Sequence, residues 1–160
     1  MDFSRRSSTD VIGAIAAVLM IFSLIVLDWF TLSVTPPREQ GEDFICGVGE
    51  YACTGFQTFP ILRWLLIAAA VAPFILTYII LRGHKLSWAP GEMTMVVGFT
   101  AFVLILYNGI IDKPGSEGEE IGISLEIGYY IAMLAALGLA ASGVGRMMEA
   151  GSVRKTPGTV

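Results

Sequence analysis

Four long stretches without a charged side chain set the pattern of this chain. Each is apolar around its whole circumference, whereas a helix of a soluble bundle needs a polar face. A helix rises about 1.5 Å per residue, so each stretch comes close to the roughly 30 Å of a hydrocarbon core. The stretches run from Val11 to Leu27, from Trp64 to Leu81, from Met93 to Ile111 and from Ile127 to Gly145.

This pattern predicts an all-α membrane protein, a four-helix transmembrane bundle. Of the 160 residues, 15% are charged, well below the roughly 25% of soluble domains. The spans leave no room for a separate soluble domain, so a single transmembrane domain is expected over residues 11–149. The expected spans are residues 11–30, 61–82, 92–111 and 124–146, with an outer loop at 31–60 and tails at 1–10 and 150–160.

The basic residues predict how the chain faces. Positive charge marks the cytoplasmic side of a membrane protein. One side has the basic residues Arg5, Arg6, Arg82, Lys85, Arg146, Arg154 and Lys155, whereas Arg38, Arg63 and Lys113 fall on the other. We therefore expect a multi-pass protein of the cell (inner) membrane with both tails cytoplasmic. The formal net charge of −4 and the lack of a basic face argue against nucleic-acid binding.

The long outer loop contains the two cysteines of the chain, Cys46 and Cys53. On the expected topology they face the oxidising side, which favours a structural disulfide that closes a small part of this loop. Gly47 and Gly49 would let the backbone turn between them, with a short β-hairpin as one outcome. Unpaired thiols are the alternative. Redox or metal chemistry would want closer cysteines or a nearby histidine, and His84 falls on the other side.

The spans contain no ionisable residue at membrane depth. Proton- and ion-coupled transporters place such a residue there, so a pump or exporter is not expected. Ser23 is the one polar residue in the middle of the first span, and a neighbouring carbonyl can satisfy its hydroxyl. A passive pathway stays open as an alternative. The sequence predicts no catalytic residue, no cofactor and no metal site.

Charges collect at the outer rim of the spans. Asp28 ends the first span, Arg63 begins the second, Asp112 ends the third and Glu126 begins the fourth. We expect these four to lie near one interfacial plane, with Arg63 paired to Asp28 or Glu126. The alternative is that Arg63 extends into the lipid headgroups. Several aromatic residues, including Trp29, fall near the same plane, where amphipathic rings are favoured, although some would pack between helices.

Small residues recur along the first and fourth spans. In lipid, small residues let helix backbones approach closely and so drive helix association. The residues are Gly13 and Ala17 in the first span, and Gly128, Ala132, Ala136, Ala140 and Gly145 in the fourth. They predict either packing inside one bundle or formation of a homodimer through the fourth helix.

Several residue runs carry a family resemblance. They are Leu27-Asp28-Trp29-Phe30, Ser87 to Glu92, Tyr107 to Gly115 and Ile123 to Tyr130. Together they resemble a group of small four-helix integral membrane proteins from actinobacteria. The resemblance implies an inner-membrane location and no established activity. The layout is also similar to that of claudins, with inside termini, a tryptophan after the first span and paired cysteines in the first outer loop, although the Gly-Leu-Trp run of claudins is absent.

The function expected from these features is interaction rather than catalysis. We expect a structural, scaffold or accessory protein that presents its first outer loop to a partner. The partners would be the lipid bilayer and another membrane protein, or a second copy of the chain through the fourth helix. The alternative is a passive channel or transporter for a small or lipidic solute.

Overall fold

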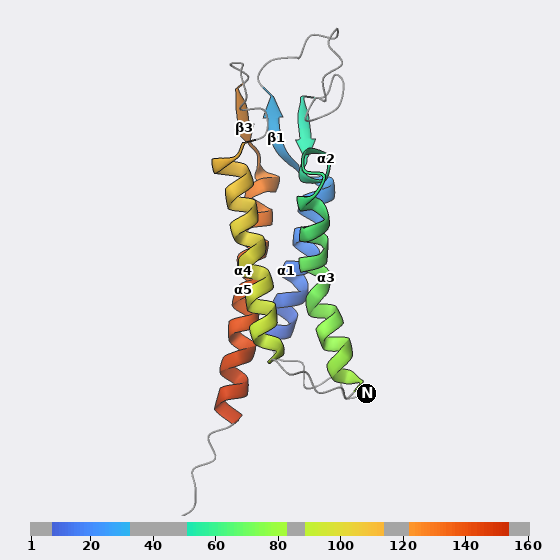
Figure 1. Cartoon of the computed structure of the whole chain (residues 1–160), viewed down its shortest axis with the longest axis vertical. Helices are drawn as coiled ribbons and strands as arrows, with labels where there is room; N and C mark the ends of the chain where they lie inside the picture. Colours follow the sequence, from blue (N-terminus) through green and yellow to red (C-terminus); the bar gives the residue numbers. More distant parts are fainter. Residues whose placement is uncertain (1–7, 33–50, 83–88, 114–121, 154–160) are drawn as a thin grey trace, which may run out of the picture.

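Four long helices lie side by side, with a small β-sheet at one end (Figure 1). The computed structural model describes residues 8–32, 51–82, 89–113 and 122–153. The long helices are α1 (Ser8–Val26), α3 (Leu62–Leu81), α4 (Pro90–Leu106) and α5 (Ile127–Val153). The shorter elements are α2 (Gly55–Thr58), the π-helical turn η2 (Tyr107–Ile111) and the strands β1 (Asp28–Leu32), β2 (Ala52–Thr54) and β3 (Ile123–Leu125).

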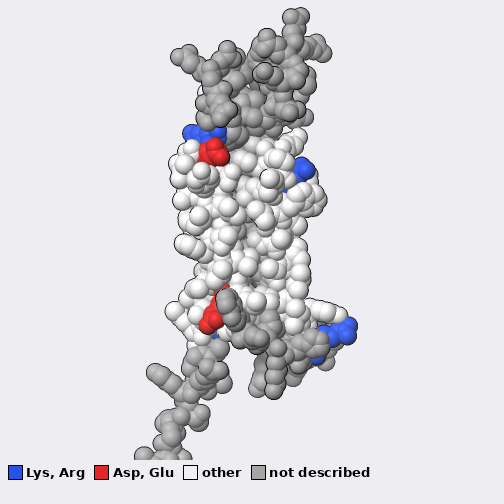
Figure 2. Space-filling view, in the orientation of Figure 1, with Lys and Arg blue, Asp and Glu red and all other residues white. Residues whose placement is uncertain are grey.

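All four long helices are long and apolar enough to cross a membrane. In the described part of the chain, charged side chains lie near the two ends of the face drawn in Figure 2, with an uncharged band between them. Large apolar side chains are exposed along every long helix, for example Val18 at 60%, Phe99 at 57% and Leu134 at 64%. This distribution fits helices surrounded by lipid and is compatible with a multi-pass membrane protein.

The expected first span is too long. Helix α1 ends at Val26, whereas the expected span continued to residue 30, and residues 28–32 form β1 instead. The fourth span is displaced in the same way. Its first expected residues, 124–126, belong to β3 or follow it, and α5 starts at Ile127. Apolar content alone does not distinguish a helix end from a strand that is buried on top of the bundle.

The sheet corrects the expectation of an all-α fold. Its strand order is β2-β1-β3, and both pairs are antiparallel. Strand β1 follows α1 directly, β2 lies at the end of the first outer connection, and β3 immediately precedes α5. The hairpin considered between the two cysteines involves residues 46–50, which lie outside the described residues. The sheet therefore joins three separate parts of the chain above the helices.

Helix α5 is the helix that packs most extensively, along both α1 and α4, while α3 packs against α1 and α4. The contact between α4 and α5 depends on glycines in both helices. A Cβ atom at Gly98 would overlap the backbone of Ala140, and one at Gly143 would overlap the backbone of Met95. These two helices therefore touch backbone to backbone, as small residues allow in membrane bundles.

The predicted small-residue positions lie between helices of this same chain. Ala17, Ala132 and Ala136 are completely buried. A Cβ atom at Gly13 would lie 2.8 Å from Ser142 Oγ, and one at Gly145 would overlap Thr9. Gly128 packs under β1, and Ala140 lies against Gly98. The stripe is covered by α1, α4 and β1, so a homodimer through α5 would need other residues of that helix.

Candidate functional site at the sheet end of the bundle

The chain turns from α1 into β1 around one buried tryptophan. The last four carbonyl groups of a helix lack a partner within the helix, and Ser23 has one of them. The indole N–H of Trp29 donates a hydrogen bond to the Ser23 carbonyl oxygen, at 3.0 Å. Trp29 is completely buried. The side chain that follows the helix therefore satisfies the helix end and fixes where the strand begins.

The Ser23 hydroxyl connects this turn to α5. It donates a hydrogen bond to the backbone carbonyl of Gly128, and the Trp29 indole nitrogen lies 3.2 Å from the Ser23 oxygen. A Cβ atom at Gly128 would lie 2.5 Å from the Asp28 carbonyl oxygen. The absence of a side chain at Gly128 thus allows β1 to lie directly on the first turn of α5.

Four aromatic rings form the core below the sheet. Trp29, Phe30, Phe59 and Tyr129 pack mainly edge to face, with ring centroids between 5.7 and 6.3 Å apart. A regular strand would send Trp29 and Phe30 to opposite faces, but the register shifts between Asp28 and Phe30, and both are buried. Trp29, Phe30 and Tyr129 are therefore core residues, whereas Trp64, at 58% exposed, fits the expected interfacial position.

Tyr129 also joins α5 to the end of α4. Its hydroxyl donates a hydrogen bond to the Ile105 carbonyl oxygen at 3.2 Å. Beside it α4 continues into the π-helical turn η2, where the Asp112 N–H donates to the Tyr107 carbonyl. A Cβ atom at Gly109 in this turn would overlap the Tyr129 ring. The wider turn and the missing side chain make room for the tyrosine.

The strands hold the ends of two connections that lie outside the described residues, 33–50 and 114–121. Leu32 N–H donates to the Tyr51 carbonyl at 2.8 Å, which closes the base of the first connection. Glu126 N–H donates to the Trp29 carbonyl at 2.9 Å, and the Thr31 hydroxyl donates to the Glu126 carboxylate at 3.0 Å. Both connections therefore start or end at positions fixed by the sheet.

The expected ion pair of Arg63 with Asp28 or Glu126 is not formed between these residues. Within the described residues, the ion pair present is that of Arg146 with Asp10 at the opposite end of the bundle. Arg63 instead contacts aromatic rings and a carbonyl group of the preceding segment, while Glu126 accepts from Thr31. Asp28 and Asp112 are exposed. Neutral partners close in sequence thus take the place of the expected carboxylates.

Cys53 is completely buried in β2, opposite Phe30 of β1. Cys46 lies outside the described residues, so the disulfide between them stays a prediction. Burial at this position shows that the end of the cysteine-containing segment belongs to the core below the sheet rather than to its solvent-facing side.

The polar groups inside the described part of the bundle are bonded to nearby carbonyls. The buried polar side chains are Ser23, Thr94 and Ser142, and each hydroxyl donates to a backbone carbonyl. No group of histidine, cysteine and acidic residues suited to a metal occurs among the described residues. The interior is therefore filled by apolar and aromatic side chains and by satisfied hydroxyl groups.

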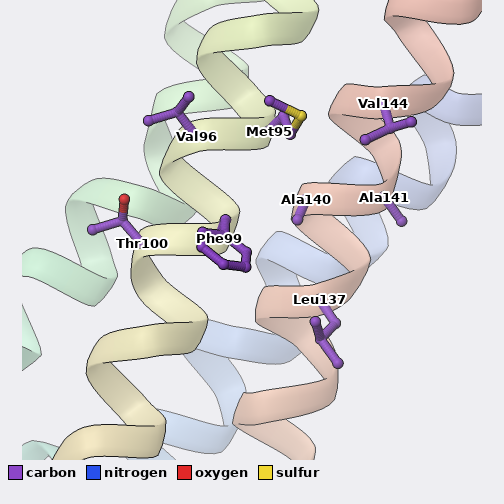
Figure 3. A pocket seen from close by; sticks show the side chains of 8 residues that line it. All are labelled: Met95, Val96, Phe99, Thr100, Leu137, Ala140, Ala141 and Val144. Atoms are coloured by element: carbon purple, nitrogen blue, oxygen red, sulfur yellow. The ribbon is translucent and has the colours of Figure 1, made fainter.

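A shallow groove of about 530 Å³ lies on the outside of the bundle between α4 and α5 (Figure 3). Met95 and Phe99 point from α4 toward α5. Thr100 is the polar residue of the lining, and the other lining residues are Met95, Val96, Phe99, Leu137, Ala140, Ala141 and Val144. Lipid chains fit such an apolar surface, and nothing about it points to a chemical reaction.

Several residues that shape the sheet end were not predicted from the sequence. Gly55 and Gly109 lie against the rings of Trp29 and Tyr129, and Phe59 packs between Trp29 and Phe30. In the sequence, each of them is a glycine or an aromatic residue close to a span boundary, and this position alone does not specify a contact partner.

Comparison with known proteins gives no further identification. No protein-family model matches the chain, and neither the curated proteins nor the solved structures contain a match. The resemblance to small actinobacterial membrane proteins therefore stays a prediction.

Proposed function

We propose that this chain is a multi-pass membrane scaffold or accessory subunit that presents the connections above its sheet to a protein partner. The anchoring of β1 supports this proposal most directly. Trp29 bonds the strand to Ser23 of α1, Ser23 bonds α1 to α5, and β1 in turn pairs with both β2 and β3. A partner that binds residues 33–50 or 114–121 would therefore meet connections whose ends are joined to the helices through the sheet.

The topology is part of the same proposal. The distribution of basic residues favours the sheet end outside the cell membrane and both tails in the cytoplasm. On that side a disulfide between Cys46 and Cys53 would constrain the first connection beside β2. The sheet end would then lie outside the cell membrane, where it could meet partners in the envelope.

The alternative of a passive channel or transporter has less support. A pathway for a polar solute needs polar groups that face a continuous cavity. The hydroxyl groups buried in the described helices are instead bonded to carbonyls, and the groove between α4 and α5 opens on the outer surface of the bundle. We therefore favour interaction over transport.

Photocrosslinking in cells tests this proposal. A photoreactive amino acid at Tyr51, which is 58% exposed beside the first connection, should give a discrete crosslinked product with a partner. The same probe at Phe74, which is 45% exposed on α3, is the matched control at lipid depth. The product should disappear when residues 33–50 are replaced by a Gly-Ser segment of equal length.

Two results would contradict the proposal. One is an absence of crosslinked product at Tyr51 under conditions where the protein is folded and abundant. The other is solute flux by the purified chain reconstituted alone into vesicles, at rates that a variant with a plugged pathway abolishes. The second result would support the transport alternative.

A further inference from the structure

Arg63 is a cation that has no counter-charge among the described residues. It lies at the second residue of α3, at the sheet end of the bundle. Its guanidinium carbon lies 4.8 Å from the ring centroid of Phe56 and 5.6 Å from that of Trp64, and Nη1 donates to the Phe56 carbonyl at 3.3 Å. All of these partners are neutral. Within the described residues, no carboxylate lies within 4 Å of this guanidinium.

The two rings hold the guanidinium in a fixed position. Phe56 and Trp64 contact each other edge to face, with centroids 6.2 Å apart. The Arg63 Nε atom is buried and makes no hydrogen bond to any described residue. Because Nε is buried, an outside ligand would bind at the Nη groups, and a guanidinium beside two rings is suited to donate a charge-assisted hydrogen bond to a phosphate oxyanion there.

An exposed apolar stripe on α3 begins directly beside this cation. Trp64 is 58% exposed, and Val71 and Ile75 continue the stripe toward the other end, with exposures of 36% and 52%. Trp64 also has an indole N–H, a further donor on the ring that lies beside the Arg63 guanidinium. In a membrane this stripe faces lipid chains, so a headgroup at its upper end would lie beside Arg63.

We infer that Arg63, Phe56 and Trp64 form a binding site for the phosphate diester of an anionic phospholipid. The acyl chains would lie along the exposed stripe of α3, and the phosphate would accept hydrogen bonds from the guanidinium and the indole. This site is independent of the proposed scaffold function, because it requires only that α3 crosses a bilayer.

Arg82, at the other end of α3, offers a matched control. It follows the last residue of α3, is exposed, and stacks on one ring, that of Tyr78, at 5.1 Å. General attraction between a basic side chain and anionic lipid would make the two arginines equivalent. A specific site at Arg63 would make substitution of Arg63 weaken lipid binding more than substitution of Arg82.

Titration of the detergent-solubilised full chain with phosphatidylglycerol, followed by native mass spectrometry, tests the inference. Arg63→Gln should weaken the tightest lipid-binding event about tenfold, in line with the loss of charge-assisted hydrogen bonds. Arg63→Lys and Trp64→Phe should each weaken it about threefold, because one keeps the charge and the other keeps the ring. Arg82→Gln should leave this event unchanged. The unfolding temperature of each variant shows whether it is folded. If Arg63→Gln does not fold, Arg63→Lys and Trp64→Phe still test the site.

Three outcomes would overturn the inference. Equal affinity in the unsubstituted chain and in Arg63→Lys and Trp64→Phe would exclude recognition by these donors. Equal weakening by Arg63→Gln and Arg82→Gln would indicate general electrostatic attraction. Displacement of the lipid by millimolar inorganic phosphate would assign the site to a soluble anion instead of a phospholipid.

Discussion

Two glycines from distant parts of the chain enclose the indole of Trp29. A Cβ atom at Gly55 would lie 2.6 Å from the ring carbons Cδ2 and Cε2, and one at Gly128 would lie 2.9 Å from Cδ1. Real Cβ atoms do not approach so closely. The indole can therefore reach the Ser23 carbonyl only because both neighbours lack a side chain.

Substitution of Gly128 by alanine should destabilise the protein by about 1–3 kcal/mol, the usual cost of overpacking a core. Gly138→Ala is the matched control in the same helix, because its Cβ would meet a single methyl group, that of Ala16, at 3.1 Å. Gly138 lies in the interior of α5 and Gly128 in its first turn, so we compare the two variants after allowing for the larger gain in helix propensity at Gly138, and the remaining difference reports the contact with β1. Thermal unfolding in detergent, followed by circular dichroism, measures it, and equal stability of the two variants would contradict this account of the turn.

At the level of elements, the end of the bundle opposite the sheet is closed by polar contacts between α1 and α5. Arg146 Nε lies 2.7 Å from Asp10 Oδ1, and the arginine side chain is 14% exposed whereas that of the aspartate is 41% exposed. Thr9 donates to Glu149 at 3.2 Å one turn further along α5. The pair is partly buried, so we expect its contribution to the free energy of unfolding to lie between those of exposed and buried ion pairs.

Asp10→Asn should lower the free energy of unfolding by about 1–2 kcal/mol, because it leaves the Arg146 charge without a partner. Glu92→Gln is the control, since Glu92 is also an acid in the first turn of a long helix but is exposed and makes no ion pair with a described residue. Denaturation in mixed micelles measures both. If Asp10→Asn and Arg146→Gln had strictly additive effects in the double variant, the two residues would not be coupled.

The predicted disulfide would constrain the connection between β1 and β2. In the chain-entropy model, closing the ring between Cys46 and Cys53 contributes about 2.5 kcal/mol. Alkylation of the denatured, unreduced protein should add no label, and reduction should then expose both thiols, as intact mass will show. A chain isolated from its membrane under thiol-blocking conditions with both cysteines already alkylated would show that the pair is not formed.

The sequence predicted the long helices well because a membrane span needs an unbroken apolar run, which can be recognised without knowledge of any partner. It did not predict β3, because the register of Ile123–Leu125 depends on β1, more than 90 residues away in the chain. The predicted ends of the first and fourth spans were wrong for the same reason, because the strands beside them form through contacts with distant parts of the chain. Trp29 belongs to the core because Gly55 and Gly128 make room for it, and neither contact can be read from local periodicity.

The rim charges illustrate a second limit of sequence patterns. Asp28, Arg63 and Glu126 lie in or beside β1, the start of α3 and the end of β3. Pairing, however, depends on competing partners, and Arg63 meets the rings of Phe56 and Trp64, which lie close in sequence to the start of α3. Glu126 is occupied by Thr31 from the neighbouring strand. Opposite charge at a similar depth therefore did not suffice to predict an ion pair.

For the molecule as a whole, we expect the four long helices to cross a bilayer with the sheet on one side. Single cysteines in a chain whose native cysteines are replaced by serine test this most directly. The positions are Ser124 in β3, Phe99 in the middle of α4, and Met148 near the end of α5, all of which are exposed. A membrane-impermeant maleimide reports which of them water reaches, and from which side.

In intact cells or spheroplasts, the reagent should label Ser124→Cys, should label Met148→Cys only after the membrane is permeabilised, and should label Phe99→Cys only after denaturation. Labelling of Ser124→Cys and Met148→Cys from the same side, or labelling of Phe99→Cys in the folded protein, would contradict the membrane-spanning bundle.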